Sequence, residues 1–146
     1  MGLDQLYQQT VLAHNREPQN FYEMKPATHT ALGNNALCGD ELRVYLEVDK
    51  GKIISASFQG EACAIATASA SMMTEWLVGR TLTEARIAAA DFENMLYSRP
   101  FNHKLLAGTV SLEPVKAFPS RIKSATLCWH AMCAALDGVE EVTTEE

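Results

Sequence analysis

The sequence predicts an α+β protein, in which a small antiparallel sheet of about three strands packs against several helices. Residues 42–48 and 54–59 both alternate apolar with polar side chains, on either side of the turn segment 49–52. This period of two indicates a β-hairpin. Apolar residues at helical spacing then recur in three later segments, at residues 64–78, 84–97 and 119–136.

The chain opens with a predicted helix at residues 3–16, and Pro18 ends it because proline cannot continue a helix. A loop is expected to follow. Weak alternation over residues 28–33 predicts a third strand beside the hairpin. Within the second strand of the hairpin, alternation places three apolar side chains on one face, those of Ile54, Ala56 and Phe58.

The hairpin brings together residues that are far apart in the sequence. Gly51 permits the positive φ that a tight turn between Lys50 and Gly51 requires. Cys38 and Cys63 are equally far from that turn, so antiparallel pairing places both cysteines, with Asp40, at the open end of the hairpin. Two thiols and a carboxylate suit zinc or an iron–sulfur cluster. From spacing alone, however, the two cysteines can equally be ordinary buried thiols.

The helix predicted at residues 64–78 starts directly after Cys63 and stops at Gly79. Free backbone amides and the helix dipole at its N-terminus favour the thiolate form of Cys63, which is the better ligand and nucleophile. Small residues dominate positions 62–71. They favour close packing of this helix against the sheet.

Two further segments lie before the last helix. Thr81 or Thr83 can cap a helix at residues 84–97. Residues 105–118 are expected to form a short helix or a loop. The core residues expected of the capped helix are Ile87, Phe92 and Leu96.

The last predicted helix runs from Pro119 to Leu136 and carries the other two cysteines. At about 100° per residue, Cys128 lies on the same edge of its core face as Ser124, whereas Cys133 lies roughly 140° from Cys128. Cys133 is therefore expected to be the core cysteine, while Cys128 can be a core residue or a ligand. The core face itself follows a 3-4-3-4 spacing, at Ile122, Ala125, Trp129, Met132 and Leu136.

Length and composition are those of an ordinary globular protein. The 146 residues predict one domain, residues 1–137, followed by an acidic, disordered tail at residues 138–146. The last ten residues hold five of the 18 acidic groups, which leaves 13 acidic against 12 basic residues, and no basic stripe indicates nucleic-acid binding. With neither a long apolar run nor a signal peptide, the expected location is the cytoplasm, without a membrane partner. The four cysteines should be reduced there, which favours metal or thiol chemistry over disulfides.

Three motifs resemble the U-type iron–sulfur cluster assembly proteins, especially their SufU-like branch, which is related to IscU and to the N-terminal domain of NifU. The motifs are Asn35-x-x-Cys38-Gly39-Asp40, then Gly60-Glu61-x-Cys63-x-Ile65, and later Phe118-Pro119-x-Arg121-Ile122-Lys123-x-Ala125. The resemblance covers nearly the whole chain. It implies a compact α+β domain that accepts sulfur from a cysteine desulfurase, and that either assembles a cluster or passes persulfide onward.

By this resemblance, Cys38, Asp40 and Cys63 match metal-site residues of the family, which implies that they bind Zn²⁺ or a 2Fe-2S cluster. The third cysteine of the family falls at Ser124, whose neutral side chain is a poor ligand. Cys128, one helical turn further on, is a candidate replacement for that metal ligand. Cys63 and Cys128 are the candidate sulfur acceptors, with Cys38 as a third option.

Two functions are compatible with these residues. In the first, the protein is a scaffold or sulfur-transfer protein rather than a conventional enzyme, and its partners are a cysteine desulfurase and the apoproteins or carriers that receive sulfur or clusters. In the second, the protein still docks a desulfurase but has lost sulfur acceptance or cluster assembly, because Ser124 replaces the cysteine. A structural zinc module is a weaker third reading, since a domain of this length can fold without a metal.

Three charged or titratable side chains near these motifs have alternative roles. Lys123 stands where the scaffold branch of the family has a histidine. Arg121 and Lys123 can hold a persulfide, a carboxylate or an acidic partner near the site, or can simply be a charged first turn of the helix. His14 is expected to make a polar contact of the first helix rather than to belong to a partner surface.

Overall fold

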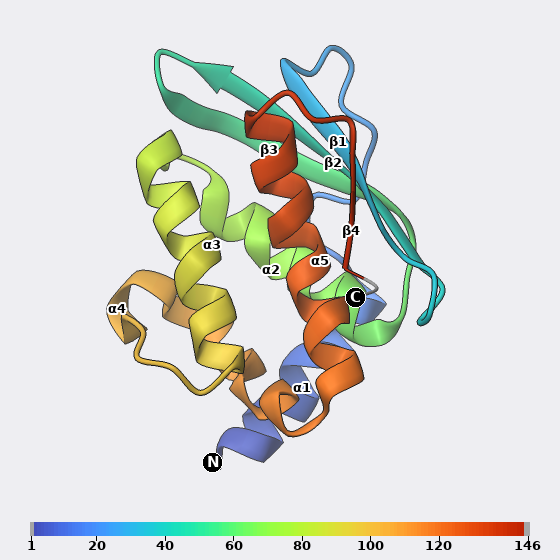
Figure 1. Ribbon diagram of the computed structural model, residues 1–146, viewed down its shortest axis with the longest axis vertical. Helices are drawn as coiled ribbons and strands as arrows, with labels where there is room; N and C mark the ends of the chain where they lie inside the picture. Colours follow the sequence, from blue (N-terminus) through green and yellow to red (C-terminus); the bar gives the residue numbers. More distant parts are fainter. Residues whose placement is uncertain (1, 145–146) are drawn as a thin grey trace.

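The computed structural model of the protein, which describes residues 2–144, has the predicted α+β fold. Across these residues it forms one four-stranded sheet in the order β3-β2-β1-β4, with helices packed on one face of that sheet (Figure 1). The elements, in chain order, are α1 (Leu3–Arg16), β1 (His29–Asn35), β2 (Asp40–Asp49), β3 (Lys52–Glu61), α2 (Ala64–Leu77), α3 (Leu82–Leu96), α4 (His103–Leu106), the 3₁₀ helix η1 (Ala107–Ala117), α5 (Pro119–Leu136) and β4 (Glu141–Thr143).

The β2–β3 hairpin turns where the sequence predicts, between Lys50 and Gly51, and these two residues have φ angles of 51° and 76°. Near the turn the pairing is symmetric about that point, but a β-bulge after Glu47 shifts the register by one residue. Asp40 therefore approaches the segment leading to Cys63 in a register that simple symmetry about the turn does not give.

The bulge also changes which side chains of β3 are buried. Ile54 is the extra residue, since Ile53 and Ser55 pair with consecutive residues of β2. Ile53 is buried together with Ala56 and Phe58, whereas Ile54 is 46% exposed. The predicted shared face of Ile54, Ala56 and Phe58 is thus wrong at Ile54, because an inserted residue reverses the alternation on one side of the bulge.

The predicted third strand forms as β1 and pairs antiparallel with β2, which puts Asn35 directly opposite Asp40. The other edge of β1 pairs in parallel with β4, a strand that the sequence analysis did not predict. The prediction of a disordered tail is therefore wrong for residues 141–143, because their backbone groups pair with an otherwise open sheet edge. Glu145 and Glu146, also assigned to that tail, lie outside the described residues.

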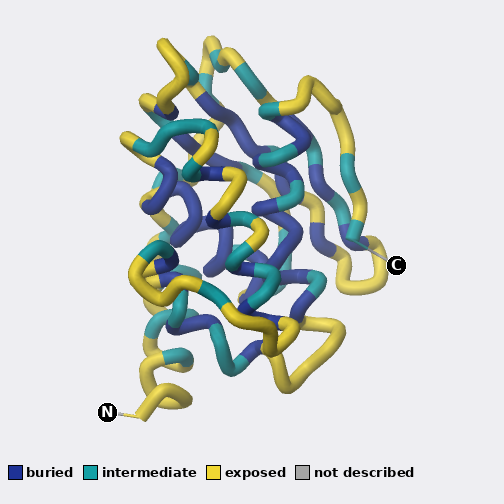
Figure 2. Tube along the Cα trace, turned by 60° about the vertical axis from the view of Figure 1, so that its left-hand side comes forward, coloured by how far each residue is buried: buried dark blue, intermediate teal, exposed yellow. Residues whose placement is uncertain are grey.

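Helix α5 occupies the centre of the fold, against β1 and β2 on one side and α2 and α3 on the other. Figure 2 shows that buried residues run through the middle of the molecule, with exposed segments around them. Gly33 lets α5 approach the sheet closely, since a Cβ atom there would lie 3.0 Å from Leu127 Cδ1. Because α5 is covered on two sides, its buried surface is much wider than one amphipathic stripe.

Helices α2 and α3 are capped by the residues that precede them, Cys63 and Thr81. Thr81 and Glu84 form a capping box, and the backbone N–H of Thr81, as a donor to Glu84, is the main cause that lowers the pKa of the Glu84 carboxyl from its ordinary value. Phe92 and Leu96 are buried as predicted, but Ile87 is 51% exposed. The buried stripe of α3 runs instead through smaller residues, Ala85 and Ala88.

Helix α1 is attached more loosely than the other long helices. It contains no buried residue, and it lies against α2 and η1 at one end of the molecule (Figure 1). Leu3 and Leu6 are both more than 40% exposed. Within residues 2–144, no helix combines the length and apolarity needed to cross a membrane.

Candidate functional site

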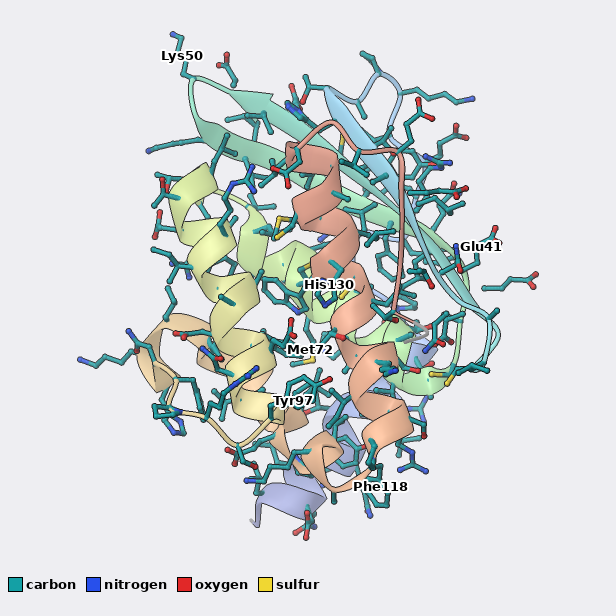
Figure 3. All side chains as sticks on the ribbon, in the orientation of Figure 1. Glu41, Lys50, Met72, Tyr97, Phe118 and His130 are labelled. Carbon is teal, nitrogen blue, oxygen red and sulfur yellow. The ribbon has the colours of Figure 1, made fainter. Side chains whose placement is uncertain are left out.

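The open end of the hairpin carries the motif cysteines. Figure 3 labels Lys50 at the turn of the hairpin and Glu41 near its open end. Cys38 lies in the connection from β1 to β2, where its backbone N–H donates to the carbonyl of Asn35 at 3.1 Å. Its side chain is exposed, and its Sγ is 3.9 Å from the carbonyl oxygen of Ser120 in the first turn of α5. Cys38 is thus the more exposed of the two motif thiols.

Asp40 is the residue that joins the parts of the site. It is only 2% exposed, and its two carboxylate oxygens accept hydrogen bonds from different elements. The Cys63 backbone N–H donates to Oδ1 at 2.7 Å, and the Ser124 hydroxyl donates to Oδ2 at 2.8 Å. Asp40 therefore holds the first residue of β2, the start of α2 and the buried side of α5 in one network.

Cys63 is the N-cap residue of α2, as the sequence predicts. Its Sγ accepts a hydrogen bond from the Ala66 backbone N–H at 3.5 Å, and the side chain is partly exposed. A thiolate or persulfide anion at this position faces the positive end of the helix dipole and unpaired backbone amides. The local geometry therefore suits a nucleophilic sulfur.

Asn35 is a buried polar group for which the sequence analysis assigned no role. It pairs with Asp40 across β1 and β2, and residues directly opposite each other project from the same face of a sheet. Its side chain is 1% exposed, yet neither amide atom has a hydrogen-bond partner among the described residues. Leaving such a group unpaired costs about 1–3 kcal/mol. The sequence signal is its place at the start of the first motif.

Ser124 and Cys128 lie on the same buried side of α5, as predicted, but in different surroundings. Cys128 is 0% exposed, and its Sγ lies 3.4 Å from the Ser69 hydroxyl oxygen. Burial raises the pKa of the Cys128 thiol to about 12. The idea that Cys128 supplies a metal ligand or accepts sulfur is not supported by this position, because its sulfur is inside the core and keeps its proton.

Cys133, expected to be the core cysteine, is less buried than Cys128. It lines a small cavity of about 190 Å³ between α3 and α5, near Arg86. Partial burial raises the pKa of the Cys133 thiol, and the nearby Arg86 opposes that effect. The order of burial is reversed from the prediction because α5 is packed on two sides.

The Cys38 thiol should therefore be alkylated faster than the Cys128 thiol in the native protein. With iodoacetamide at neutral pH, Cys38 should be alkylated at least about 100-fold faster than Cys128, because only an accessible thiolate reacts. Mass spectrometry of peptides from a labelling time course would measure both rates. Equal rates for Cys38 and Cys128 in folded protein would contradict the placement of Cys128, and in denaturant the difference should disappear.

The site does not form a complete metal centre as it stands. Within residues 2–144, no group of three or more His, Cys, Asp or Glu side chains is arranged to hold a metal ion. Cys38, Asp40 and Cys63 match the kinds of ligand that zinc accepts. Both oxygens of Asp40 are engaged by other hydrogen bonds, however, and the neighbouring α5 position offers only the Ser124 hydroxyl.

The remaining polar residues singled out in the sequence make local contacts. The Nδ1 atom of His14 lies 2.6 Å from the Ser71 hydroxyl oxygen, which confirms the expected polar contact of α1. Arg121 stacks over the ring of Phe118, with its Cζ atom 4.4 Å from the ring centroid. A role for Arg121 and Lys123 toward a persulfide or an acidic partner stays a prediction.

Comparison with known proteins identifies the family. Residues 6–125 match the NifU-like N terminal domain. The chain is 34% identical over 132 residues to the zinc-dependent sulfurtransferase SufU of Bacillus subtilis, a match that covers 90% of this chain and 89% of that protein. It is also 34% identical over 135 residues to the iron–sulfur cluster assembly scaffold protein IscU of Streptococcus pyogenes, covering 92% and 84% of the two chains.

The fold agrees with these matches. A candidate scaffold protein for the SUF system of Fervidobacterium islandicum superposes with a TM-score of 0.86 at 30% identity, over 92% of this chain and 99% of that one. A NifU-like protein of Brucella abortus superposes with a TM-score of 0.84 at 25% identity, over 93% and 95%. The chain therefore belongs to the NifU-like N-terminal domain family, the iron–sulfur cluster assembly proteins that include SufU and the IscU scaffolds.

Proposed function

We propose that this protein accepts sulfur from a cysteine desulfurase on Cys63 and passes it to an apoprotein or carrier in the cytoplasm. The observation that carries the proposal is the 2.7 Å hydrogen bond from the Cys63 backbone N–H to Asp40. It fixes the start of α2 against the hairpin and leaves the Cys63 thiol partly exposed. Membership of a family that contains a sulfurtransferase supports the same function.

The reaction needs no oxidant. The Cys63 thiolate attacks the outer sulfur of a persulfide on the desulfurase, a new sulfur–sulfur bond forms at Cys63, and the bond to the desulfurase cysteine breaks. The desulfurase cysteine leaves as a thiolate. Cys63 is then the persulfide, and attack by a recipient thiolate on its outer sulfur repeats the exchange.

In this proposal, zinc or a nascent 2Fe-2S cluster binds to the protein only weakly. Cys38, Asp40 and Cys63 are the residues that would hold it, and their donor atoms are suitable in kind. The set is incomplete in its present arrangement, because Ser124 supplies no thiolate and instead donates a hydrogen bond to Asp40. Sulfur acceptance on Cys63 does not depend on a bound metal in this proposal.

The second candidate function is a binding or regulatory protein that docks a desulfurase without accepting sulfur. The hydrogen bond from Ser124 to Asp40 is the observation that favours it. A hydroxyl at this position neither attacks a persulfide nor binds a metal as an anion. The two functions differ in whether sulfur becomes covalently attached to this protein.

Sulfur transfer distinguishes the two functions directly. After incubation with its cysteine desulfurase and cysteine, the protein should carry an additional sulfur atom on the peptide that contains Cys63. The amount of sulfur bound to the Cys63→Ser variant should be at least about 10-fold lower, since serine gives no thiolate.

Cys128→Ala is the matched control, and it should retain the sulfur because Cys128 is fully buried. Peptide mapping by mass spectrometry after alkylation of the persulfide gives the readout. Sulfur found only on Cys38 would overturn the assignment to Cys63. A stable complex with the desulfurase but no sulfur on any cysteine would favour the second function.

A further inference from the structure

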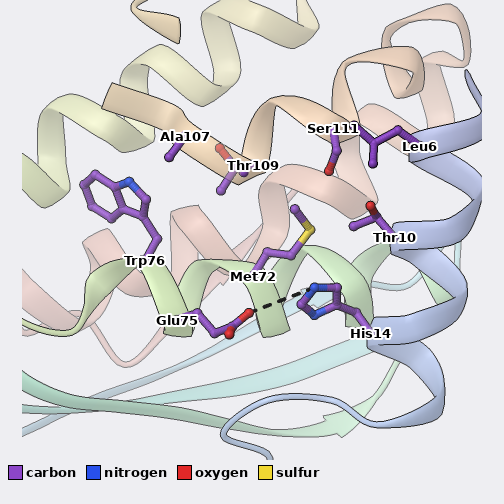
Figure 4. Close-up of a pocket in the computed structure, with 10 residues that line it drawn as sticks. Leu6, Thr10, His14, Met72, Glu75, Trp76, Ala107, Thr109 and Ser111 are labelled. Atoms are coloured by element: carbon purple, nitrogen blue, oxygen red, sulfur yellow. Dashed lines mark ion pairs between the residues drawn. The ribbon is translucent and has the colours of Figure 1, made fainter. Parts of the chain in front are cut away.

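A cavity of about 470 Å³ lies between α1, α2 and η1 (Figure 4). Met72 and Trp76 of α2 form part of its wall, and Met72 is nine residues after Cys63. Nine residues of helix correspond to about 13 Å along the axis. The cavity is thus separate from the cysteine site, and its volume is within the range of small-molecule sites.

One end of the cavity holds a polar group that the protein does not satisfy. Ser111 of η1 is 6% exposed, and its hydroxyl has no hydrogen-bond partner among the described residues. Figure 4 shows this hydroxyl directed into the space beside Thr10 and Met72. An unpaired buried hydroxyl costs about 1–3 kcal/mol. A group that enters the cavity and bonds to Ser111 would recover that cost.

A second polar position lies between α1 and α2. The Nδ1 atom of His14 is engaged by the Ser71 hydroxyl at 2.6 Å, which leaves Nε2 facing Glu75. Nε2 and the Glu75 carboxylate oxygen are 4.0 Å apart, and this is too long for a direct hydrogen bond. The Glu75 carboxylate is an acceptor, and Nε2 is one too in the tautomer in which Nδ1 donates its proton to Ser71, so that one cationic donor group between them would bond to both.

The charge of the lining selects the ligand further. Glu75 is the one residue of the lining with a formal charge at neutral pH when histidine is counted as neutral. A carboxylate without a neighbouring lysine or arginine in the lining disfavours anions and favours an ammonium group. Between the two polar positions the surface is apolar, formed by Leu6, Met72 and Trp76.

We propose that this cavity binds a small amphipathic amine, with its ammonium group between Glu75 and His14, an apolar body against Met72 and Trp76, and a polar far end at Ser111. The ligand would bury part of α1, which contains no buried residue of its own. Binding therefore stabilises the attachment of α1 to α2 and η1. This site uses none of the cysteines and goes beyond the proposed sulfur transfer.

The test uses aminohexanol as the probe in an NMR titration of the full chain. The amide resonances of α1, α2 and η1 that line the cavity should shift, with a dissociation constant on the order of millimolar for so small a ligand. Hexanediol lacks the charge and hexylamine lacks the far hydroxyl, so each should bind at least about 3-fold more weakly. Hydroxyhexanoate, which reverses the charge, should not bind.

Two variants assign the contacts. Glu75→Gln should lower the affinity for aminohexanol by at least about 3-fold and leave the affinity for hexanediol unchanged, since only the amine has the charge-assisted bond. Ser111→Ala should lower the affinity for aminohexanol but not the affinity for hexylamine. Glu93→Gln is the matched control, because Glu93 forms a similar pair with His130, at 3.3 Å, between α3 and α5.

The proposal is overturned if aminohexanol shifts no resonance of the cavity, if hydroxyhexanoate binds as well, or if Glu75→Gln and Glu93→Gln have equal effects. The Cys63→Ser variant should bind the amine as the wild type does. Failure of sulfur transfer and failure of amine binding are therefore separate results.

Discussion

Replacing Ser124 with cysteine is expected to raise the affinity of the protein for zinc by about 100-fold or more, because the site then has three thiolates and a carboxylate. In the wild type, the Ser124 hydroxyl donates to Asp40 at 2.8 Å and contributes no charge. Because Ser124 is 1% exposed and lies beside the Asp40 carboxylate, a cysteine there keeps its proton without metal and replaces the hydroxyl by a larger, weaker donor. The metal-free variant should therefore be less stable than the wild type, and the zinc-bound variant more stable.

Competition with a chromophoric zinc chelator measures the affinity, and thermal unfolding with and without zinc measures the stability. Ser124→Ala removes the hydrogen bond without adding a thiol, so it should not gain affinity. Cys128→Ala should leave the affinity of either background unchanged, since the Cys128 sulfur contacts Ser69 in the core. If Ser124→Cys binds zinc no better than Ser124→Ala, Ser124 is not the residue that weakens the metal site.

The hairpin shows how far local sequence patterns reach. The turn at Lys50 and Gly51 follows from glycine and from alternation in the flanking strands, and both are local properties. The bulge after Glu47 is not visible in that alternation, because Ile53 and Ile54 are equally apolar. Which isoleucine is buried depends on the pairing with β2, and therefore on contacts that are distant in the sequence.

The two cysteines of α5 show a different limit. Helical periodicity places Ser124 and Cys128 on one edge correctly, but it assumes that a helix has one buried face. In the fold α5 lies between the sheet and the helices α2 and α3, so Cys128 is fully buried. Strand β4 was missed for a related reason, since three residues of an acidic tail become a strand only when β1 offers its edge.

The residues of the candidate site can be identified from the sequence, but most of the contacts between them cannot. The hairpin pattern brings Cys38, Asp40 and Cys63 to one end of the molecule, and the structure links Asp40 to Cys63 directly. The resemblance to a known family identified Ser124 as the departure. Neither could show that Ser124 donates to Asp40, or that the Asn35 amide is buried without a partner, because these depend on side-chain orientation.

Gly60→Ala should lower the free energy of unfolding by about 3–5 kcal/mol. Gly60 has a φ of +140°, a backbone angle that residues with a side chain rarely adopt. An added Cβ would also collide with the carbonyl oxygen of Glu41 and lie 3.0 Å from the Leu42 Cα. The collision is with backbone, so no rotation of a side chain can relieve it. Denaturant unfolding followed by circular dichroism measures the change.

Gly39→Ala is the matched control for the collision, because Gly39 also has a positive φ, of +72°, but an added Cβ there meets nothing within 4 Å. This control should cost only about 1 kcal/mol, from backbone strain alone. Equal losses for the two variants would show that β3 does not approach β2 as closely as the structure has it.

Relief of the collision at Gly60→Ala requires β3 to move away from Glu41, the residue next to Asp40. Because β3 leads directly to Cys63, that movement breaks the hydrogen bond between Cys63 and Asp40. Any Gly60→Ala protein that remains folded should therefore also accept less sulfur, whereas folded Gly39→Ala keeps this hydrogen bond.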